Sequence, residues 1–370
     1  MDTFPEMSSS LTSDERFDTY AAAREKLSDR LEAYQPQNNN DDTVHFLRRV
    51  FRSLPVKGMA QLANDAESCD HDNKLRKLVK RLDRALLRPM MATGGRTPGM
   101  SPLPCLDVEG SLEDLRDRNF QSATGLPQAQ VREACLRRDN HRCVVTGFWD
   151  SRYHGRPRGA YTSRLKAAHI IPLGLGNLRA DGRRRHAQFW TCLYRYFPTI
   201  HNLFHYGDED VNRLDNIIML DSVLHEEFGH FNFVLEETDV SDRYRVKVFS
   251  LAHFYIMPHL PEFVTITSHD PQCPAPNKYL LAVHAAIGKM LHATGRGELV
   301  AKIMKHLDDS GGHSLARDGS SDVEELLSVT CLSSLAIDSS DCESAHEEKQ
   351  PGHVGSWLPG AQCSTFRRYS

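Results

Sequence analysis

The chain contains 370 residues, of which 40% are hydrophobic and 25% are charged, and its formal net charge is −4. These values are typical of a folded globular protein and exclude a chain that is disordered throughout. The acidic balance also excludes a uniformly basic nucleic-acid-binding protein, and the length predicts two domains with tails.

The N-terminal sequence predicts an intracellular protein. Residues 1–16 are polar and acidic, unlike a secretory signal. No apolar run approaches the ~18 residues that a membrane-spanning helix needs, so we expect no membrane partner. The nine cysteines form no Cys-x-x-Cys pair, which favours reduced, buried thiols. The run Arg183–Arg185 is too short to decide between nucleus and cytoplasm.

The spacing of apolar residues predicts a helical N-terminal region over residues 1–88. Helices are expected at Asp14–Tyr34, capped by Ser13, at Phe46–Leu54, and at Asp72–Arg88. Such apolar stripes indicate a packed helical layer. The alternative, a dimerising coiled coil, needs more heptads than the pattern contains.

Two segments are predicted to lie outside the folded domains, one as a linker and one as a tail. Residues 89–127 predict a linker, because glycine and proline are dense in their first half. Residues 311–370 are acidic and rich in serine, which predicts a disordered tail. Its apolar segment Val323–Ile337 is either a terminal helix or a docking segment. We expect any protein partner to bind this tail or the N-terminal helices.

The remaining region, residues 128–310, has a charge balance of its own. Residues 131–200 contain 14 Lys and Arg against four acids, with aromatic residues interleaved. This pattern favours nucleic-acid binding, and the alternative is a solvated face that meets the acidic tail. The candidate contacts are Arg142, Arg164, Lys166, Arg183, Arg184 and Arg185.

Three segments carry the candidate chemistry. The first is RDNHRCVVTG, residues 138–147. The second, KAAHIIP at residues 166–172, predicts a short strand that ends at His169 and is stopped by Pro172. The third, residues 214–228, predicts a strand at Ile217–Leu220. A helix then follows, capped by Asp221 or Ser222, with His225 in its first turn.

This order of strand, strand and helix, carrying histidine, asparagine and histidine, resembles the ββα-metal core of the HNH endonucleases. It is most similar to HNH-nuclease-domain proteins of filamentous fungi, whose pattern runs RC-x-x-TG, AAHI-x-P and N-x-x-x-L-x-x-x-x-H-x-x-F. The matching residues are Arg142, Cys143, Thr146, Gly147, Ala167 to Pro172, Asn216, Leu220, His225 and Phe228.

The resemblance implies a metal-dependent endonuclease that hydrolyses phosphodiester bonds, with DNA favoured over RNA as the substrate. In the family, the histidine at the His169 position is the general base. The asparagine at the Asn216 position orients the loop that carries this base. The histidine at the His225 position binds a divalent ion. The implied fold is α+β, with a small ββα-metal core braced by an antiparallel hairpin and helices.

The sequence departs from the family pattern at the metal. Many active members have Asp or His before the general base, where this chain has Ala168, and Gly229 stands where a second helix ligand falls. Asp221 is the predicted second ligand, in competition with a role as helix cap. One imidazole with oxygen donors favours Mg²⁺ or Mn²⁺ over Zn²⁺.

Two further observations complete the prediction. His201 and His205 have the spacing of two ligands on one helix face, although an amphipathic segment is the favoured interpretation. The bracing elements are expected at Phe231–Glu237, Tyr244–Phe249, Val264–Ser268 and Asn277–Ala293.

Three functions remain open from the sequence. The first is the endonuclease. The second is a catalytically degenerate HNH-fold module that binds nucleic acid or a protein without cleavage, motivated by Ala168 and Gly229. The third is a regulatory scaffold whose N-terminal helices and acidic tail bind partners.

Overall fold

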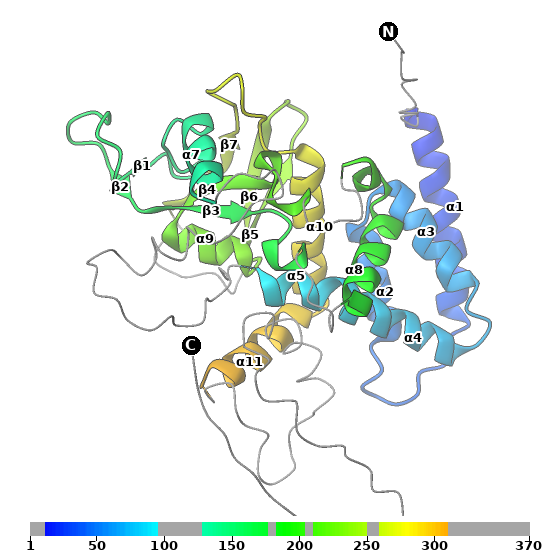
Figure 1. Ribbon diagram of the computed structural model, residues 1–370. Helices are drawn as coiled ribbons and strands as arrows, with labels where there is room; N and C mark the ends of the chain where they lie inside the picture. Colours follow the sequence, from blue (N-terminus) through cyan, green and yellow to red (C-terminus); the bar gives the residue numbers. More distant parts are fainter. Residues whose placement is uncertain (1–11, 95–127, 177–182, 204–209, 250–258, 310–370) are drawn as a thin grey trace, which may run out of the picture. The chain divides into compact units, whose positions relative to one another are not determined.

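The computed structural model describes residues 12–94, 128–176, 183–203, 210–249 and 259–309. The chain divides into two compact units, residues 1–336 and 337–370, and every described residue belongs to the first. Helices and small sheets are mixed in this unit, in agreement with the predicted α+β class (Figure 1). Within the described ranges, no helix is long and apolar enough to cross a membrane.

The N-terminal part is helical, as the apolar spacing predicts. Its helices are α1 (Ser13–Glu32), α2 (Thr43–Ser53), α3 (Val56–Glu67), α4 (Asp72–Leu82) and α5 (Arg88–Thr93). The helix cap of α1 is Thr12 rather than the predicted Ser13. Thr12 and Glu15 hydrogen-bond each other's backbone N–H groups, so two N–H groups at the helix start gain partners.

The helical region continues past residue 88, where the sequence predicts the start of a linker. A π-helical turn, Asp83–Leu87, joins α4 to α5. Proline has no N–H to donate within a helix, and Pro89 stands at the start of α5, directly after this turn. The Arg88 N–H bonds the Asp83 carbonyl oxygen across the turn, so the chain stays helical to Thr93.

The centre of the unit is an antiparallel strand pair followed by a helix. Strand β3 (Leu165–His169) pairs with β4 (Ile217–Asp221), so that His169 lies opposite Ile217. Helix α9 (Ser222–Gly229) begins directly after β4. Every residue of β4 is buried. These bounds agree with the strands and the helix that the sequence predicts.

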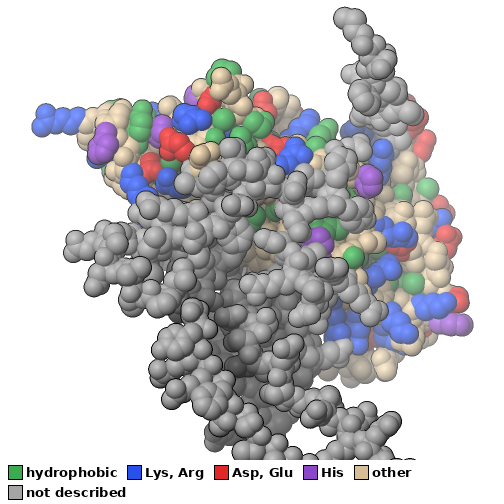
Figure 2. All heavy atoms as spheres, in the orientation of Figure 1, with side chains coloured by type: hydrophobic (Ala, Val, Ile, Leu, Met, Phe, Trp, Pro, Cys, Tyr) green, Lys and Arg blue, Asp and Glu red, His purple; other side chains and the backbone are tan. Residues whose placement is uncertain are grey.

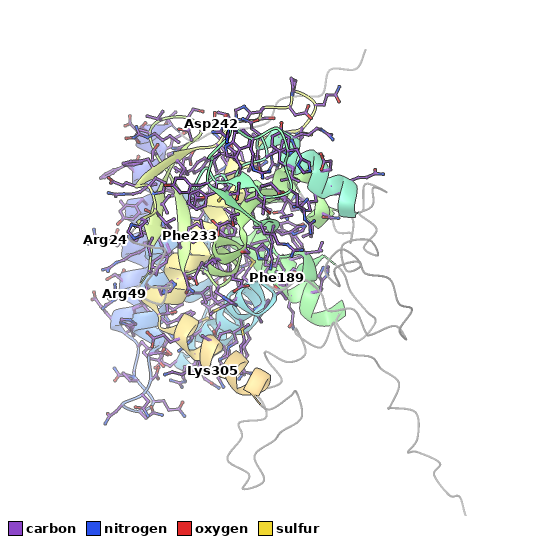
Figure 3. All side chains as sticks on the ribbon, turned by 90° about the vertical axis from the view of Figure 1, so that its left-hand side faces the viewer. Arg24, Arg49, Phe189, Phe233, Asp242 and Lys305 are labelled. Atoms are coloured by element: carbon purple, nitrogen blue, oxygen red, sulfur yellow. The ribbon has the colours of Figure 1, made fainter. Side chains whose placement is uncertain are left out.

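Two further sheets flank this centre. Strands β1 (Trp149–Asp150) and β2 (Thr162–Ser163) form a short parallel pair. Strands β5 (Phe233–Glu237), β6 (Arg243–Val248) and β7 (Phe263–Thr265) form an antiparallel sheet in that order. In Figure 3, Phe233 lies inside the fold and Asp242 at the outer end of the β5–β6 hairpin.

The last strand is shorter than the predicted Val264–Ser268. It ends at Thr265 because Ser268 belongs to a turn. The Ser268 hydroxyl donates to the Cys273 carbonyl oxygen at 2.8 Å and accepts from the Asp270 N–H. These local bonds compete with strand pairing.

Four more helices complete the described part: α7 (Gln128–Arg138), α8 (Arg183–Tyr196), α10 (Lys278–Ala293) and α11 (Arg296–Asp309). Helix α8 lies in the insert between His169 and Asn216 and packs on α3. The contact centres on buried Asp65, which accepts hydrogen bonds from Arg195 and from the Tyr196 hydroxyl at 2.7 Å. Burial raises the pKa of Asp65, but these bonds bring it below its ordinary value.

Helix α10 holds the end of α9 through a buried histidine. The His284 ring stacks between Phe228 and Phe231, at centroid distances of 3.8 and 4.3 Å. Its Nε2–H donates to the Phe228 carbonyl oxygen at 3.1 Å. Burial lowers the pKa of His284 to about 3, so this imidazole is neutral in the folded protein at neutral pH.

We expect the free energy of unfolding to fall as the pH is lowered from about 6.5 toward 3. Over this range His284 stays neutral in the folded chain, whereas the unfolded chain binds a proton there, so acid favours unfolding. His284→Leu should flatten the slope between pH 6.5 and 4, measured by urea unfolding. It should also cost about 1–3 kcal/mol at pH 7, because the Phe228 carbonyl loses its partner.

The control is His154→Gln, because His154 lies exposed on a loop. This variant should keep the slope of the parent protein. An unchanged slope in His284→Leu would contradict the assignment of this titration to the buried ring.

Candidate active site

The strand pair and α9 bring together the residues that the sequence singles out. His169 ends β3, and Asn216 immediately precedes β4 on the neighbouring strand. His225 lies in α9, which packs against β3. A proton on His169 would lower the pKa of His225, so the two imidazoles are close neighbours.

Asn216 fastens the loop that follows His169. Its Nδ2 donates to the carbonyl oxygen of Ile171 at 2.9 Å, and its Oδ1 accepts from the Ile171 N–H at 2.9 Å. A third bond joins Nδ2 to the Val211 carbonyl oxygen at 2.7 Å. The side chain is fully buried, so each bond forms away from competing water. The turn at Val211 and the loop after His169 are therefore fixed to the same amide.

A buried ion pair holds the start of β4 in place. Arg138 is fully buried and makes two hydrogen bonds to Asp139, at 2.7 and 2.8 Å. Its guanidinium also donates to the carbonyl oxygens of Leu214 and Ile217. Asp139 accepts from the Met219 N–H at 3.0 Å. The first of the three sequence segments therefore positions Asn216 by binding the backbone on both sides of it.

His169 is held in one orientation by a residue from the insert. Its Nε2 lies 3.0 Å from Oδ1 of Asn212, a distance at which Nε2–H donates to this oxygen. In that tautomer Nδ1 carries the lone pair, and no described residue hydrogen-bonds it. Burial lowers the pKa of His169 below its ordinary value, and the bond to Asn212 opposes this only in part. The side chain is therefore a neutral imidazole at pH 7.

His225 is nearly buried, with 9% of its surface exposed. Burial is the largest cause that lowers the pKa of His225, and together with the neighbouring Lys166 and His169 it brings the value to about 4. Its Nδ1 is buried and has no hydrogen-bond partner among the described residues. A buried ring nitrogen without a partner costs stability unless a ligand or ion satisfies it.

Asp221 caps α9 with one of its carboxylate oxygens. Its Oδ1 accepts from the N–H groups of Val223 and Leu224 at 3.1 and 3.0 Å. Its Oδ2 lies 3.6 Å from the Cys143 sulfur, within reach of a weak S–H bond. The predicted role of Asp221 as metal ligand stays a prediction, and any such role shares the carboxylate with the helix cap.

Among the described residues, one side chain is clearly suited to bind a divalent ion. His225 provides a buried imidazole nitrogen with an open hydrogen-bonding position. No group of three or more His, Cys, Asp or Glu in the described ranges gathers as metal ligands. His201 lies in a 3₁₀ turn, Pro198–Asn202, edge-on to Tyr194, and His205 is outside the described residues.

The predicted nucleic-acid contacts fall into three groups. Lys166 lies in β3, close enough to His225 to lower its pKa. Arg142 and Arg164 lie at the base of the loop between β1 and β2, and Figure 2 shows Lys and Arg side chains on that projecting side of the molecule. Arg183, Arg184 and Arg185 open α8, and their side chains lie outside the described part.

Sequence reasoning missed two features of this site. Asn212 lies four residues before Asn216, and each residue ends a short 3₁₀ turn. These two turns set the position of Asn212, and no sequence motif marks it. The Arg138–Asp139 pair opens the first of the three sequence segments, but its role was missed because adjacent opposite charges usually indicate an exposed surface. Their complete burial depends on carbonyl groups that lie far along the chain.

Comparison with known families identifies the segment that contains these residues. Residues 143–236 match the sequence model of the HNH endonuclease family. The matched segment ends within β5, and His169, Asn216 and His225 all lie inside it. No curated protein matches the chain significantly, and no solved structure does so either.

We expect His169 at pH 7 to be neutral, with its proton on Nε2, because Asn212 accepts from that nitrogen. Long-range ¹H–¹⁵N spectra should show Nδ1 with the shift of an unprotonated ring nitrogen. Asn212→Ala should mix the two tautomers. It should also lower the pKa of His169 further, because the lost bond raises it.

The control is Asn73→Ala, on the exposed face of α4. Its spectrum should keep the His169 signals of the parent protein. A proton on Nδ1 in the parent protein would contradict the proposed tautomer.

Proposed function

We propose that β3, β4 and α9 form the ββα-metal core of an endonuclease that hydrolyses phosphodiester bonds in DNA with a divalent ion. One arrangement carries this proposal. A neutral imidazole, His169, is fixed through Nε2 and lies beside His225, whose buried Nδ1 lacks a partner. The HNH match over residues 143–236 supports the reaction class.

His169 acts as the general base in this proposal. A neutral imidazole accepts a proton at neutral pH, and Nδ1 is the nitrogen that offers a lone pair. The attacking water gives its proton to this atom. Asn216 is a positioning residue, because it binds the loop after His169 and the turn before Asn212. The loop after His169 and the turn that carries Asn212 therefore stay fixed during the reaction.

Positive charge supports the binding of a polyanion at this site. Lys166 lies on β3 three residues before His169, and its charge reaches His225. Phosphodiester cleavage places additional negative charge on the phosphate, which a nearby ammonium group stabilises. Lys166 therefore assists both the binding of the strand and its cleavage.

His225 would hold the divalent ion, with Asp221 as the second predicted ligand. When bound, such an ion stabilises the charge that develops on the phosphate and on the leaving oxygen. Mg²⁺ or Mn²⁺ is favoured over Zn²⁺, because oxygen donors must complete a site to which the described residues bring one clear imidazole.

A second function has an observation in its favour. Ala168 stands where many active relatives have a ligand, and the described residues hold no three-ligand cluster. A chain that has lost its metal ligands would retain the fold and the positive charge. It would then bind nucleic acid, or a protein partner, without cleaving it.

Nicking of supercoiled plasmid by the full chain tests the proposal. We expect nicking with Mg²⁺ or Mn²⁺ and none with EDTA. His169→Ala should lower the rate by about 10²–10⁴-fold, the usual contribution of a general base. His225→Ala should abolish the stimulation by metal. The matched control is His71→Gln, an exposed histidine before α4, which should nick at the parent rate.

The alternative outcomes distinguish the two functions. Equal nicking by all four proteins would contradict an active site at His169. If folded protein binds the plasmid but cleaves it with no ion, the non-catalytic module is the better description. A labelled RNA of the same length tests the preference for DNA.

We expect the nicking rate to rise with pH through the pKa of His169, which lies below 6.5, and then to level off. The base must be deprotonated, so the rate follows its neutral fraction. The midpoint should move to lower pH in Asn212→Ala, because the bond that raises the pKa of His169 is lost. Rates from pH 5 to 8.5 provide the test. A rate that still rises between pH 7.5 and 8.5 would exclude His169 as the titrating base.

A further inference from the structure

The loop between β1 and β2, with its flanking residues, projects from the rest of the unit (Figure 1). We call residues 148–164 the β1–β2 arm. The arm leads directly into β3, the strand that ends at His169. Its residues have no part in the mechanism described above, although its composition is unusual for a connecting loop.

The base of the arm is a stack of four planar side chains. The guanidinium of Arg142 lies over the Trp149 ring at 4.0 Å from its centroid. Trp149 stacks with Tyr153, and Tyr153 stacks with His141 at 3.9 Å, both pairs within 6° of parallel. His141 has a positive φ of 53°, so the backbone turns sharply to place this ring.

Hydrogen bonds make this base rigid. Asp150 is buried and accepts from Arg132 at 3.0 Å and from the Arg152 N–H at 2.9 Å. Arg156 folds back to donate to the Tyr153 carbonyl oxygen at 2.5 Å. The arm is therefore a preorganised structure, which binds a ligand with little further loss of conformational entropy.

Two aromatic rings on the arm face solvent. Tyr161 is 79% exposed and Phe148 is 37% exposed. Their ring centroids lie 5.7 Å apart at an angle of 31°. These rings contribute little to the core, and large exposed aromatic surfaces usually mark a site of interaction.

The charge of the arm is almost entirely positive. Arg152, Arg156, Arg158 and Arg164 lie within it. Between Arg142 and Lys166 the one acidic residue of the sequence is Asp150, which is buried and paired with Arg132. Figure 2 shows Lys and Arg side chains at this projecting end. The partner that complements this surface is a polyanion.

We propose that the β1–β2 arm binds an unpaired base of the substrate, stacked on Tyr161 and Phe148, while its arginines contact the flanking phosphates. This inference rests on the proposed nuclease function. In a duplex, neighbouring base pairs already cover the faces of the bases, so exposed protein rings stack on unpaired nucleotides. The substrate class is therefore nucleic acid with a single-stranded, gapped or bulged segment.

The position of the arm sets where the unpaired base lies. A β-strand rises about 3.3 Å per residue, so the six steps from Ser163 to His169 span at most about 20 Å. The arm and His169 are therefore within reach of one bound strand, and they consist of different residues. Binding at the arm and cleavage at His169 are thus separable by mutation.

Fluorescence anisotropy of the full-length His169→Ala protein tests the proposal. The probes are labelled 20-nucleotide oligo(dT) and a labelled 20-base-pair duplex, at equal salt concentration. We expect tighter binding of oligo(dT), and at least about fivefold weaker binding of it when Tyr161→Ala or Phe148→Ala is added. The duplex affinity should change by less than twofold.

Two matched variants serve as controls. Tyr161→Phe keeps the ring and should keep the affinity for oligo(dT). Phe17→Ala removes an aromatic ring of 69% exposure from α1, far along the chain, and should change neither affinity. Circular dichroism verifies that each variant is folded.

The inference is overturned if Tyr161→Ala and Phe148→Ala bind oligo(dT) as tightly as the parent, or if they lose oligo(dT) and duplex equally. Its failure is separate from failure of the proposed function. If the protein nicks plasmid but its binding of oligo(dT) does not depend on the two rings, the nuclease function is supported and the role of the arm is not. If binding of oligo(dT) depends on the rings but no nicking occurs, the arm is a binding site for unpaired bases in a protein that does not cleave.

Discussion

The site depends on one buried carboxamide, that of Asn216. Its donors and its acceptor are satisfied by backbone groups of the loop after His169 and of the turn before Asn212. An aspartate would lose the two donated bonds, and an alanine would leave all three backbone partners unpaired in a dry interior. The Arg138–Asp139 pair secures the segment that carries Asn216. The backbone around His169 is therefore fixed by bonds remote from its ring, and the bond from Nε2 to Asn212 then orients the ring itself.

Burial determines the charge state of the histidines around this centre. The pKa values of His169, His225, His284 and His292 are all lowered, and burial is the largest cause for each. Neutral rings suit both the packing of the core and the proposed role of His169 as general base. His284 and His292 donate to carbonyl oxygens at the end of α9 without bringing charge into the core, and His169 keeps a lone pair for a proton. The cost is a fold that acid weakens.

Much of the centre follows from local sequence signals. Pro172 stops a strand just beyond His169, Asp221 caps a helix, and Asn277 caps α10, so these elements lie close to their predicted bounds. Helix α3 was not anticipated, because its apolar positions are interrupted, and its buried Asp65 is satisfied from another helix. Asn212 escaped prediction for a similar reason. Its importance lies in a contact across the chain, which no spacing rule records.

The N-terminal helices and the candidate site are joined through the insert. Pairing of β3 with β4 closes a long loop, and the entropy lost on closure must be offset by contacts that this loop makes. Helix α8 supplies them, because Arg195 and Tyr196 bind Asp65 on α3. A charged group buried with several hydrogen bonds holds one geometry, since displacement would leave the carboxylate unsatisfied. Anchoring α8 on α3 therefore ties the insert between His169 and Asn216 to the N-terminal helices.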